Sequence, residues 1–200
     1  MIELRVAPIV EGHGEVSAFP ILLRNIWHLL LGGIAIEVLR PIRNKRNLLA
    51  AKDKRELGRA VTLAAMKLAA AKPAAAKELI LILVDADRDL PCVLGPEITA
   101  AAAAVRRDKG TVCIVANVEY ETWFVAAADS LRKYLDLTSD PQLPSDPERL
   151  RLGKGWIKAR MPTYSETVDQ PKLSAVMDLQ LCRRQSTSFD KLCRELERQN

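Results

Sequence analysis

Apolar and polar residues alternate along residues 1–135 with two different periods, which predict strands and helices in turn. Short runs rich in β-branched residues predict strands at Ile2–Val10, 34–39, 79–84 and 111–118. Apolar residues at helical spacing predict helices over 15–31, 47–72, 97–109 and 122–135. Strands that alternate with helices favour parallel pairing through right-handed crossovers. The pattern therefore predicts an α/β fold with a Rossmann-like parallel sheet of about four strands flanked by helices.

The segment at 79–84 is a run of six apolar residues, which is typical of a strand buried on both faces at the centre of a parallel sheet. Asp85, Asp87 and Asp89 follow it at alternate positions. If the chain stays extended beyond Val84, their carboxylates share one face at a spacing of roughly 6–7 Å. Ligands of parallel sheets bind beyond the carboxyl ends of the strands, so this is a candidate site. A solvated loop after a strand is the alternative.

The first predicted strand ends in the sequence Glu-Gly-His-Gly-Glu, residues 11–15. Its two glycines allow a tight turn and a close approach of the backbone at the start of a helix. Loops that follow the first and third strands can open on the same edge, so Glu11 and Glu15 are expected to face the aspartates. We expect the Glu11 and Asp85 carboxylates to lie within about 8 Å of each other. Such a group resists ionisation unless a cation or a basic side chain such as Arg88 neutralises it.

Residues 136–200 differ in composition from the strand and helix pattern of residues 1–135. Prolines, serines and aspartates over 136–170 predict an irregular connection. Helical periodicity returns over 172–181 and 189–198, where Asp169 or Ser188 could cap a helix. We therefore predict two parts: an α/β domain over residues 1–135, and a second part over 136–200 in which the connection and a small C-terminal helical appendage pack on that domain.

The composition narrows the class of protein. The chain has 200 residues and 48% hydrophobic content, which is ample for a sizeable core. Its four cysteines form no CxxC pair, which favours reduced thiols over a zinc site or a disulfide framework. Glu3 and Arg5 interrupt the first apolar run, so no signal peptide is predicted, and no apolar span is long enough for a membrane helix. We expect a cytoplasmic protein with no membrane partner.

The net charge of +5 is unevenly distributed. Residues 40–59 contain eight basic and two acidic side chains, and residues 151–200 contain ten and six. This asymmetry favours a polyanionic partner, namely DNA or RNA, although a solvated basic helix face is the alternative. The candidate nucleic-acid-binding residues are Arg40, Arg43, Lys45, Arg46, Lys154, Lys158 and Lys172.

Two motifs carry a family resemblance. Glu11 with its following glycine at the end of the first strand, and Asp85 with Asp87 at the end of the third, resemble the TOPRIM domain of topoisomerases, primases and overcoming-lysogenization-defect (OLD) nucleases. The whole chain is similar to small stand-alone TOPRIM-like bacterial proteins catalogued as a domain of unknown function. Segments 117–123, 164–173, 177–179 and 188–189 fit that group.

The resemblance implies that Asp85 and Asp87 hold Mg²⁺ and that Glu11 acts as general acid or base in phosphodiester chemistry. It also implies an ATPase partner in a defence system, because such proteins resemble companions of ATPases.

The residue types at the candidate site indicate the same metal independently of the family resemblance. Mg²⁺ or Mn²⁺ takes oxygen ligands, and an acidic cluster that lacks histidine ligands disfavours zinc. An EF-hand calcium loop is excluded because Leu90 and Pro96 occupy the positions of its glycine and glutamate. The candidate metal ligands are Glu11, Glu15, Asp85, Asp87, Asp89, Glu119 and Glu121. Glu119 or Glu121 could complete a second ion, and Glu121 could instead be a first-turn carboxylate of the helix at 122–135.

Two functions of different classes follow. The first is a metal-dependent nuclease, in which Glu11 is catalytic and His13 shuttles protons; a lone histidine with no such role is the alternative for His13. The second is a non-catalytic TOPRIM-like sensor or partner subunit of an ATPase. Trp123 and Phe124 are expected to be core residues rather than nucleobase stackers, because they open an apolar helix.

Overall fold

The computed structural model describes residues 1–138, 143–150 and 152–200. Its centre is a five-stranded sheet in which every described strand pair is parallel. The strands are β1 (Ile2–Val10), β2 (Ile36–Val38), β3 (Ile42–Arg43), β4 (Ala75–Asp85) and β5 (Gly110–Ala116). They lie in the order β2-β1-β4-β5, and β3 also pairs with β1. The prediction of a parallel α/β fold is confirmed.

The edge beside β1 is made of two short strands rather than the single strand predicted at 34–39. β2 pairs with the first half of β1 and β3 with its end. Pro41 lies between β2 and β3, and proline has no backbone N–H to donate to a ladder.

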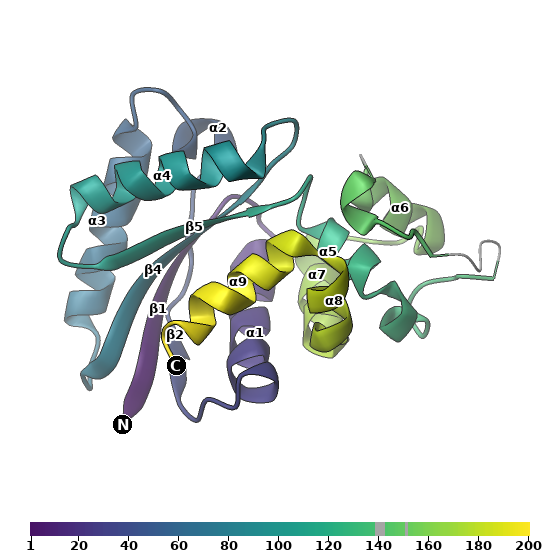
Figure 1. Ribbon diagram of the computed structural model, residues 1–200, viewed down its shortest axis with the longest axis horizontal. Coiled ribbons are helices and arrows are strands. Elements are labelled where there is room, and N and C mark those ends of the chain that lie inside the picture. Colours follow the sequence, from purple (N-terminus) through teal and green to yellow (C-terminus); the bar gives the residue numbers. More distant parts are fainter. Residues whose placement is uncertain (139–142, 151) are drawn as a thin grey trace.

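Helices cover both faces of the sheet and extend beyond one end of it. The α-helices are α1 (Glu15–Asn25), α2 (Arg46–Leu49), α3 (Arg55–Ala70), α4 (Pro91–Val105), α5 (Glu121–Ala126), α6 (Gly153–Arg160), α7 (Glu166–Val176), α8 (Leu179–Gln185) and α9 (Thr187–Glu197). A π-helical turn (Ile26–Leu30) continues α1, and 3₁₀ turns occur at Ala128–Leu131 and Pro147–Arg149. Figure 1 shows α3 and α4 on one side of the sheet and α1 and α9 on the other.

The strand β4 contributes to two cores, one on each face. Ile80 and Ile82 pack in a cluster with side chains of α3 and α4, whereas Leu81 and Leu83 pack with side chains of α1 and α9. All four side chains are fully buried. Burial of each contributes about 1.5–3 kcal/mol, which explains why a continuous apolar run forms the centre of this sheet.

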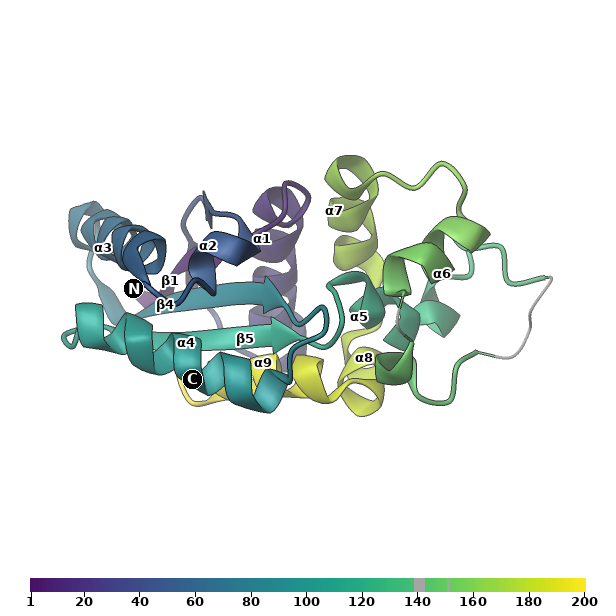
Figure 2. The same cartoon turned by 90° about the horizontal axis from the view of Figure 1, so that it is seen from above.

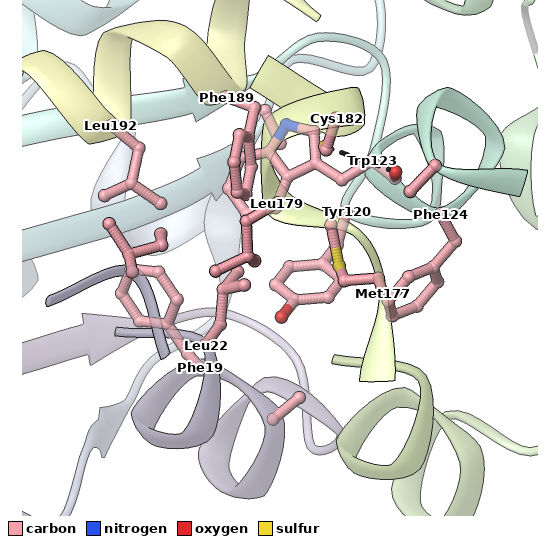
Figure 3. Packing of buried hydrophobic residues seen from close by; sticks show 14 of the residues in the cluster. Phe19, Leu22, Tyr120, Trp123, Phe124, Met177, Leu179, Cys182, Phe189 and Leu192 are labelled. Atoms are coloured by element: carbon pink, nitrogen blue, oxygen red, sulfur yellow. Dashed lines mark hydrogen bonds between the residues drawn. The ribbon is translucent and has the colours of Figure 1, made fainter. Parts of the chain in front are cut away.

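The elements α5, α6, α7 and α8 gather beyond the arrowheads of β4 and β5 (Figure 2). Aromatic rings and aliphatic side chains pack together there (Figure 3), and the ring centroids of Trp123 of α5 and Phe189 of α9 are 5.4 Å apart in an edge-to-face arrangement. Trp123 and Phe124 are fully buried, which confirms that they are core residues. The C-terminal helices therefore pack where the strands end, while the boundary at residue 135 stays a prediction.

Three predicted helices have different bounds. The helix predicted over 122–135 is the shorter α5, which ends at Ala126 and is followed by the 3₁₀ turn at Ala128–Leu131. The helix predicted over 47–72 is divided into α2 and α3, because the chain turns at Lys54, whose φ of 52° is left-handed. α4 starts at Pro91, six residues before its predicted start. Proline is favoured in the first turn of a helix because its missing N–H would have no partner there.

The region predicted to be irregular, 136–170, contains α6 and the start of α7, while residues 139–142 and 151 lie outside the described residues. The helix predicted over 172–181 is the end of α7 followed by α8. The caps also differ: Asp178 accepts from the backbone of Leu181 at α8, and Ser186 accepts from that of Phe189 at α9. Local composition did not separate a short helix such as α6 from a loop.

Within the described part of the chain, no helix is long and apolar enough to cross a membrane. The four cysteines are free thiols, three buried and one exposed.

Candidate acidic site

The first two acidic groups meet because β1 and β4 are neighbours in the sheet. Val10 lies opposite Leu83, so Glu11 and Asp85 leave the sheet side by side. The backbone N–H of Asp85 donates to Glu11 Oε2 at 3.1 Å. On the other side of β4, the backbone N–H of Tyr120 donates to Asp85 Oδ1 at 2.9 Å. The loops after β1, β4 and β5 therefore meet at one edge.

Two further carboxylates enter this edge from the starts of helices. Glu15 begins α1, and its Oε2 accepts a hydrogen bond from the backbone of Glu11 at 3.2 Å. Glu121 begins α5, and its Oε1 accepts from Tyr164 Oη at 2.9 Å and from Gln170 Nε2 at 3.1 Å. The exposed fractions of Glu15 and Glu121 are 3% and 1%. Glu121 is thus buried at this edge and is also a first-turn carboxylate of α5.

We refer to Glu11, Glu15, Asp85 and Glu121 as the inner carboxylates. Burial raises the pKa of Asp85 well above its ordinary value, and the negative charges of Glu15 and Glu11 raise it further. Burial and the charge of Glu11 raise the pKa of Glu15 to about 8. The pKa values of Glu11 and Glu121 are also raised, mainly by burial. Without a compensating cation, Glu15 therefore retains its proton near neutral pH.

The expected extended path of the chain beyond Val84 is wrong. Asp87 has a left-handed φ of 51°, its N–H donates to the carbonyl of Val118 at 2.9 Å, and the N–H of Asp89 donates back to Ala86 at 2.8 Å. This hydrogen bonding turns the chain, and aspartate tolerates the left-handed region better than most residues. Asp87 and Asp89 are therefore exposed at the rim and do not share a face with Asp85.

Arg46 of α2 neutralises these rim aspartates. Its guanidinium pairs with Asp89 and lies 3.4 Å from Asp87 Oδ2. It also donates to the carbonyl oxygens of Asp85 and Ala86, at 2.8 and 3.0 Å. We had expected a basic side chain such as Arg88 in this role. Arg46, predicted to contact nucleic acid, is largely occupied by the loop after β4.

A cleft of about 1230 Å³ opens beside the rim. It is lined by Arg46, Asp87, Arg88, Asp89, Val118, Glu119 and Leu152. Glu119 Oε1 accepts from the backbone N–H of Lys154 at 2.5 Å and so holds the start of α6 against this cleft. Gly153 makes the approach possible, because a Cβ there would lie 2.9 Å from the backbone nitrogen of Thr122.

The predicted basic residues occupy different parts of the site. Lys154 lies among the acidic groups, with its Nζ 2.9 Å from Glu166 Oε1. Burial alone would lower the pKa of Lys154, but Glu166 and Glu121 reverse this effect and raise it. Lys158 and His13 line a second cavity of about 420 Å³, together with Tyr164, Ser165, Glu166 and Thr167. Lys172 pairs with Asp169 on its own helix at 3.2 Å.

The basic run before α2 contributes one residue directly to the acidic edge. Arg43 is exposed, and its guanidinium lies 3.5 Å from the carbonyl oxygen of Glu11. Arg40 and Lys45 are exposed, and the carbonyl of Arg40 accepts a hydrogen bond from Lys67. Arg43 is therefore the member of this run that stands at the site.

The donor set suits a hard divalent cation by its chemistry. All the inner groups are carboxylates, the ligand type that Mg²⁺ and Mn²⁺ prefer. Gln170 adds an amide oxygen that is buried and has no hydrogen-bond partner among the described residues. As arranged here, no three acidic, histidine or cysteine side chains of the described ranges form a ready ligand set. Their oxygens instead accept hydrogen bonds from the protein.

The sequence pattern did not predict that Tyr164 and Gln170 belong to the site. Both belong to the segment that carries the family resemblance, but nothing in its local pattern connects them with Glu121, which is 43 and 49 residues away.

Comparison with known protein families identifies the family of this chain. A family model described as a domain of unknown function, DUF4276, matches residues 10–197. The chain belongs to this family. Among curated proteins none matches.

Two solved structures are similar to this DUF4276 chain. The C-terminal region of the Xanthomonas campestris pv. campestris OLD protein is 12% identical, with 99% of this chain and 95% of that chain covered and a TM-score of 0.44. The C-terminal region of the Burkholderia pseudomallei OLD protein is 13% identical, with 99% and 98% covered and a TM-score of 0.33.

Proposed function

We propose that this chain is a Mg²⁺- or Mn²⁺-dependent nuclease that acts on nucleic acid at the acidic edge of its sheet. The observation that carries the proposal is the gathering of the inner carboxylates from the ends of β1 and β4 and the starts of α1 and α5. Like charges buried together raise one another's pKa, and a divalent cation removes that cost. The cleft of about 1230 Å³ beside the rim is where the nucleic acid would approach them.

We assign the role of each residue from its position at the acidic edge. Asp85 would hold the ion, with further oxygen ligands from Glu11, Glu15 and Glu121. Asp87, Asp89 and Glu119 line the cleft and would be the ligands of a second ion if Arg46 released the two aspartates. Bound there, the metal would stabilise the attacking and leaving oxygens of the phosphodiester. Glu11, at the end of β1, takes the proton of the attacking water. Arg43 and Lys154 would neutralise the phosphate, and His13 and Lys158, which line the second cavity, would shuttle protons and contact the nucleic acid, respectively.

The test is cleavage by the purified chain with Mn²⁺ on single-stranded, duplex and supercoiled nucleic acid. We expect cleavage that chelator abolishes and that Asp85→Asn and Glu11→Gln reduce by at least a hundredfold. The matched control is Asp108→Asn, which removes an exposed carboxylate paired with Arg106 and should leave the rate unchanged. Cleavage that survives in chelator, or in Asp85→Asn, would contradict the proposal.

A second candidate function is a non-catalytic sensor or subunit that works with an ATPase. The observation that favours it is that the inner carboxylates already accept hydrogen bonds within the protein. Isothermal titration with Mn²⁺ separates the two: the nuclease requires binding, whereas capture of an ATPase by a chain that neither binds Mn²⁺ nor cleaves supports the second.

A further inference from the structure

Glu121 is the inner carboxylate that the C-terminal part of the chain holds most directly. Tyr164 Oη and Gln170 Nε2 donate to the same oxygen, Oε1, at 2.9 and 3.1 Å. Both donors are neutral, and both side chains are buried, with exposed fractions of 5% and 3%. The second oxygen of Glu121, Oε2, receives neither of these bonds, so the two donors together hold a single oxygen of the carboxylate.

Gln170 has little freedom to leave Glu121. Gln170 lies against the start of α1, where a Cβ on Gly14 would overlap Gln170 Oε1 and approach the carbonyl oxygen of Glu166. The Oε1 atom of Gln170 has no other partner among the described residues, although it is buried. The amide is therefore held by packing between two helices, with its donor directed at Glu121.

We propose that Tyr164 and Gln170 are positioning residues that orient Glu121 for a divalent cation, so that the segment from α6 to α7 completes the acidic site. This inference rests on the proposed function. Neutral donors suit the task because they fix the carboxylate without adding a positive charge that competes with the metal. Hydrogen bonds from such outer residues set ligand orientation, and their loss typically weakens metal binding by 10- to 100-fold.

The test compares two hydroxyl deletions at the same interface. Tyr164→Phe removes the donor to Glu121 and keeps the ring. Ser174→Ala is the control, because its buried hydroxyl on α7 lies 2.8 Å from the Tyr120 hydroxyl and touches no carboxylate. Isothermal titration with Mn²⁺ should give about a tenfold weaker affinity for Tyr164→Phe and an unchanged affinity for Ser174→Ala. Thermal denaturation in chelator should show similar small shifts for both.

Two further variants separate positioning from folding. Gln170→Met keeps the volume, removes the second donor, and should also weaken Mn²⁺ binding. In a Glu121→Gln background, Tyr164→Phe should cause no additional loss, because its effect passes through that carboxylate.

The possible outcomes are distinct. A wild type that does not bind Mn²⁺ overturns the proposed function and this inference with it. A wild type that binds, with Tyr164→Phe and Gln170→Met as tight as Ser174→Ala, overturns the inference and leaves the proposed function standing. An additive loss in the Glu121→Gln background also overturns it, because the residues would then act elsewhere.

Discussion

At the scale of single residues, Glu15 shows most clearly how burial changes the pKa of the acidic groups. Its carboxylate is buried beside Glu11, and its pKa rises from an ordinary value of 4.5 to about 8. Between these two pH values, the folded state binds a proton that the unfolded state releases. The free energy of unfolding of the metal-free protein should therefore fall as the pH rises through this window.

We predict that Glu15 contributes a decline approaching about 1.4 kcal/mol per pH unit between pH 5.5 and 7.5, measured as the difference between wild type and Glu15→Gln by urea denaturation in chelator. Glu15→Gln should reduce this slope and be more stable than the wild type at pH 7.5. The control is Glu97→Gln, which makes the same change at an exposed residue paired with Lys54 and should leave the slope unchanged. Equal slopes for wild type and Glu15→Gln would show that Glu15 does not carry the effect.

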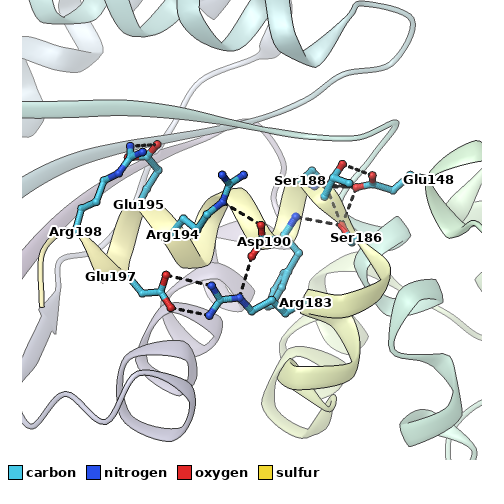
Figure 4. Close-up of polar contacts among 11 residues, drawn as sticks. Glu148, Arg183, Ser186, Ser188, Asp190, Arg194, Glu195, Glu197 and Arg198 are labelled. Carbon is cyan, nitrogen blue, oxygen red and sulfur yellow. Dashed lines mark hydrogen bonds and ion pairs between the residues drawn. The ribbon is translucent and has the colours of Figure 1, made fainter.

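At the scale of elements, Glu148 joins the segment before α6 to the start of α9 (Figure 4). Its Oε1 accepts from the backbone and side chain of Ser188 and from the Ser186 hydroxyl, and its Oε2 accepts from Thr187. Ser188 Oγ in turn accepts from Trp123 Nε1 at 2.9 Å. This network ties α9 to the aromatic core that supports the acidic edge.

Glu148→Ala should lower the free energy of unfolding by about 1–3 kcal/mol at pH 7, because it removes these bonds and leaves donors at the start of a helix unsatisfied. Burial raises the pKa of Glu148, but the bonds from Thr187 and Ser188 outweigh it, so the pKa is lowered overall. The stabilisation is then present above the ordinary value of 4.5 and is lost as the pH falls through the folded-state pKa.

Urea denaturation at pH 7 and pH 3.5 checks this prediction, with hydrogen exchange at the α9 amides as a local probe. The matched control is Glu195→Ala, which removes a carboxylate paired with Arg198 near the other end of α9. Loss of stability at pH 3.5 equal to that at pH 7 would assign the effect to packing rather than to the charge.

At the scale of the whole molecule, the acidic groups and the chain termini lie at opposite ends of the sheet. The acidic site and Arg43 lie at the carboxyl ends of the strands, whereas the two chain termini lie at the opposite end (Figure 1). There, Lys77 at the start of β4 donates to the carbonyl of Gln199 at 2.7 Å. A nucleic acid that reaches the site should therefore contact basic residues at one end only.

We predict that nucleic-acid affinity falls steeply with salt and that Arg43→Ala reduces the slope of log affinity against log salt by about one. Arg198→Ala, at the opposite end, should leave the slope unchanged. Filter binding or fluorescence anisotropy from 50 to about 200 mM salt measures both. An unchanged slope for Arg43→Ala would show that Arg43 is an ordinary surface residue that does not contact the nucleic acid.

The parallel sheet, its central strand and the edge at which the acidic residues gather could all be predicted from the sequence. These features follow from the period of apolar residues and from the rule that parallel strands end on one side, both of which are local or topological. The run at 79–84 thus predicted β4, and Glu11 and Asp85 were placed at adjacent strand ends.

The tertiary structure decided which acidic residues share a buried environment. Sequence spacing grouped Asp85 with Asp87 and Asp89, whereas hydrogen bonds to the loop after β5 turn the chain and separate them. Arg46 pairs with Asp89 at the rim, 43 residues away in the sequence. Tyr164 and Gln170 reach Glu121 through helix packing that no local period encodes. Contacts between distant segments depend on how whole elements are oriented, and that orientation is set by the complete core rather than by any one stretch of sequence.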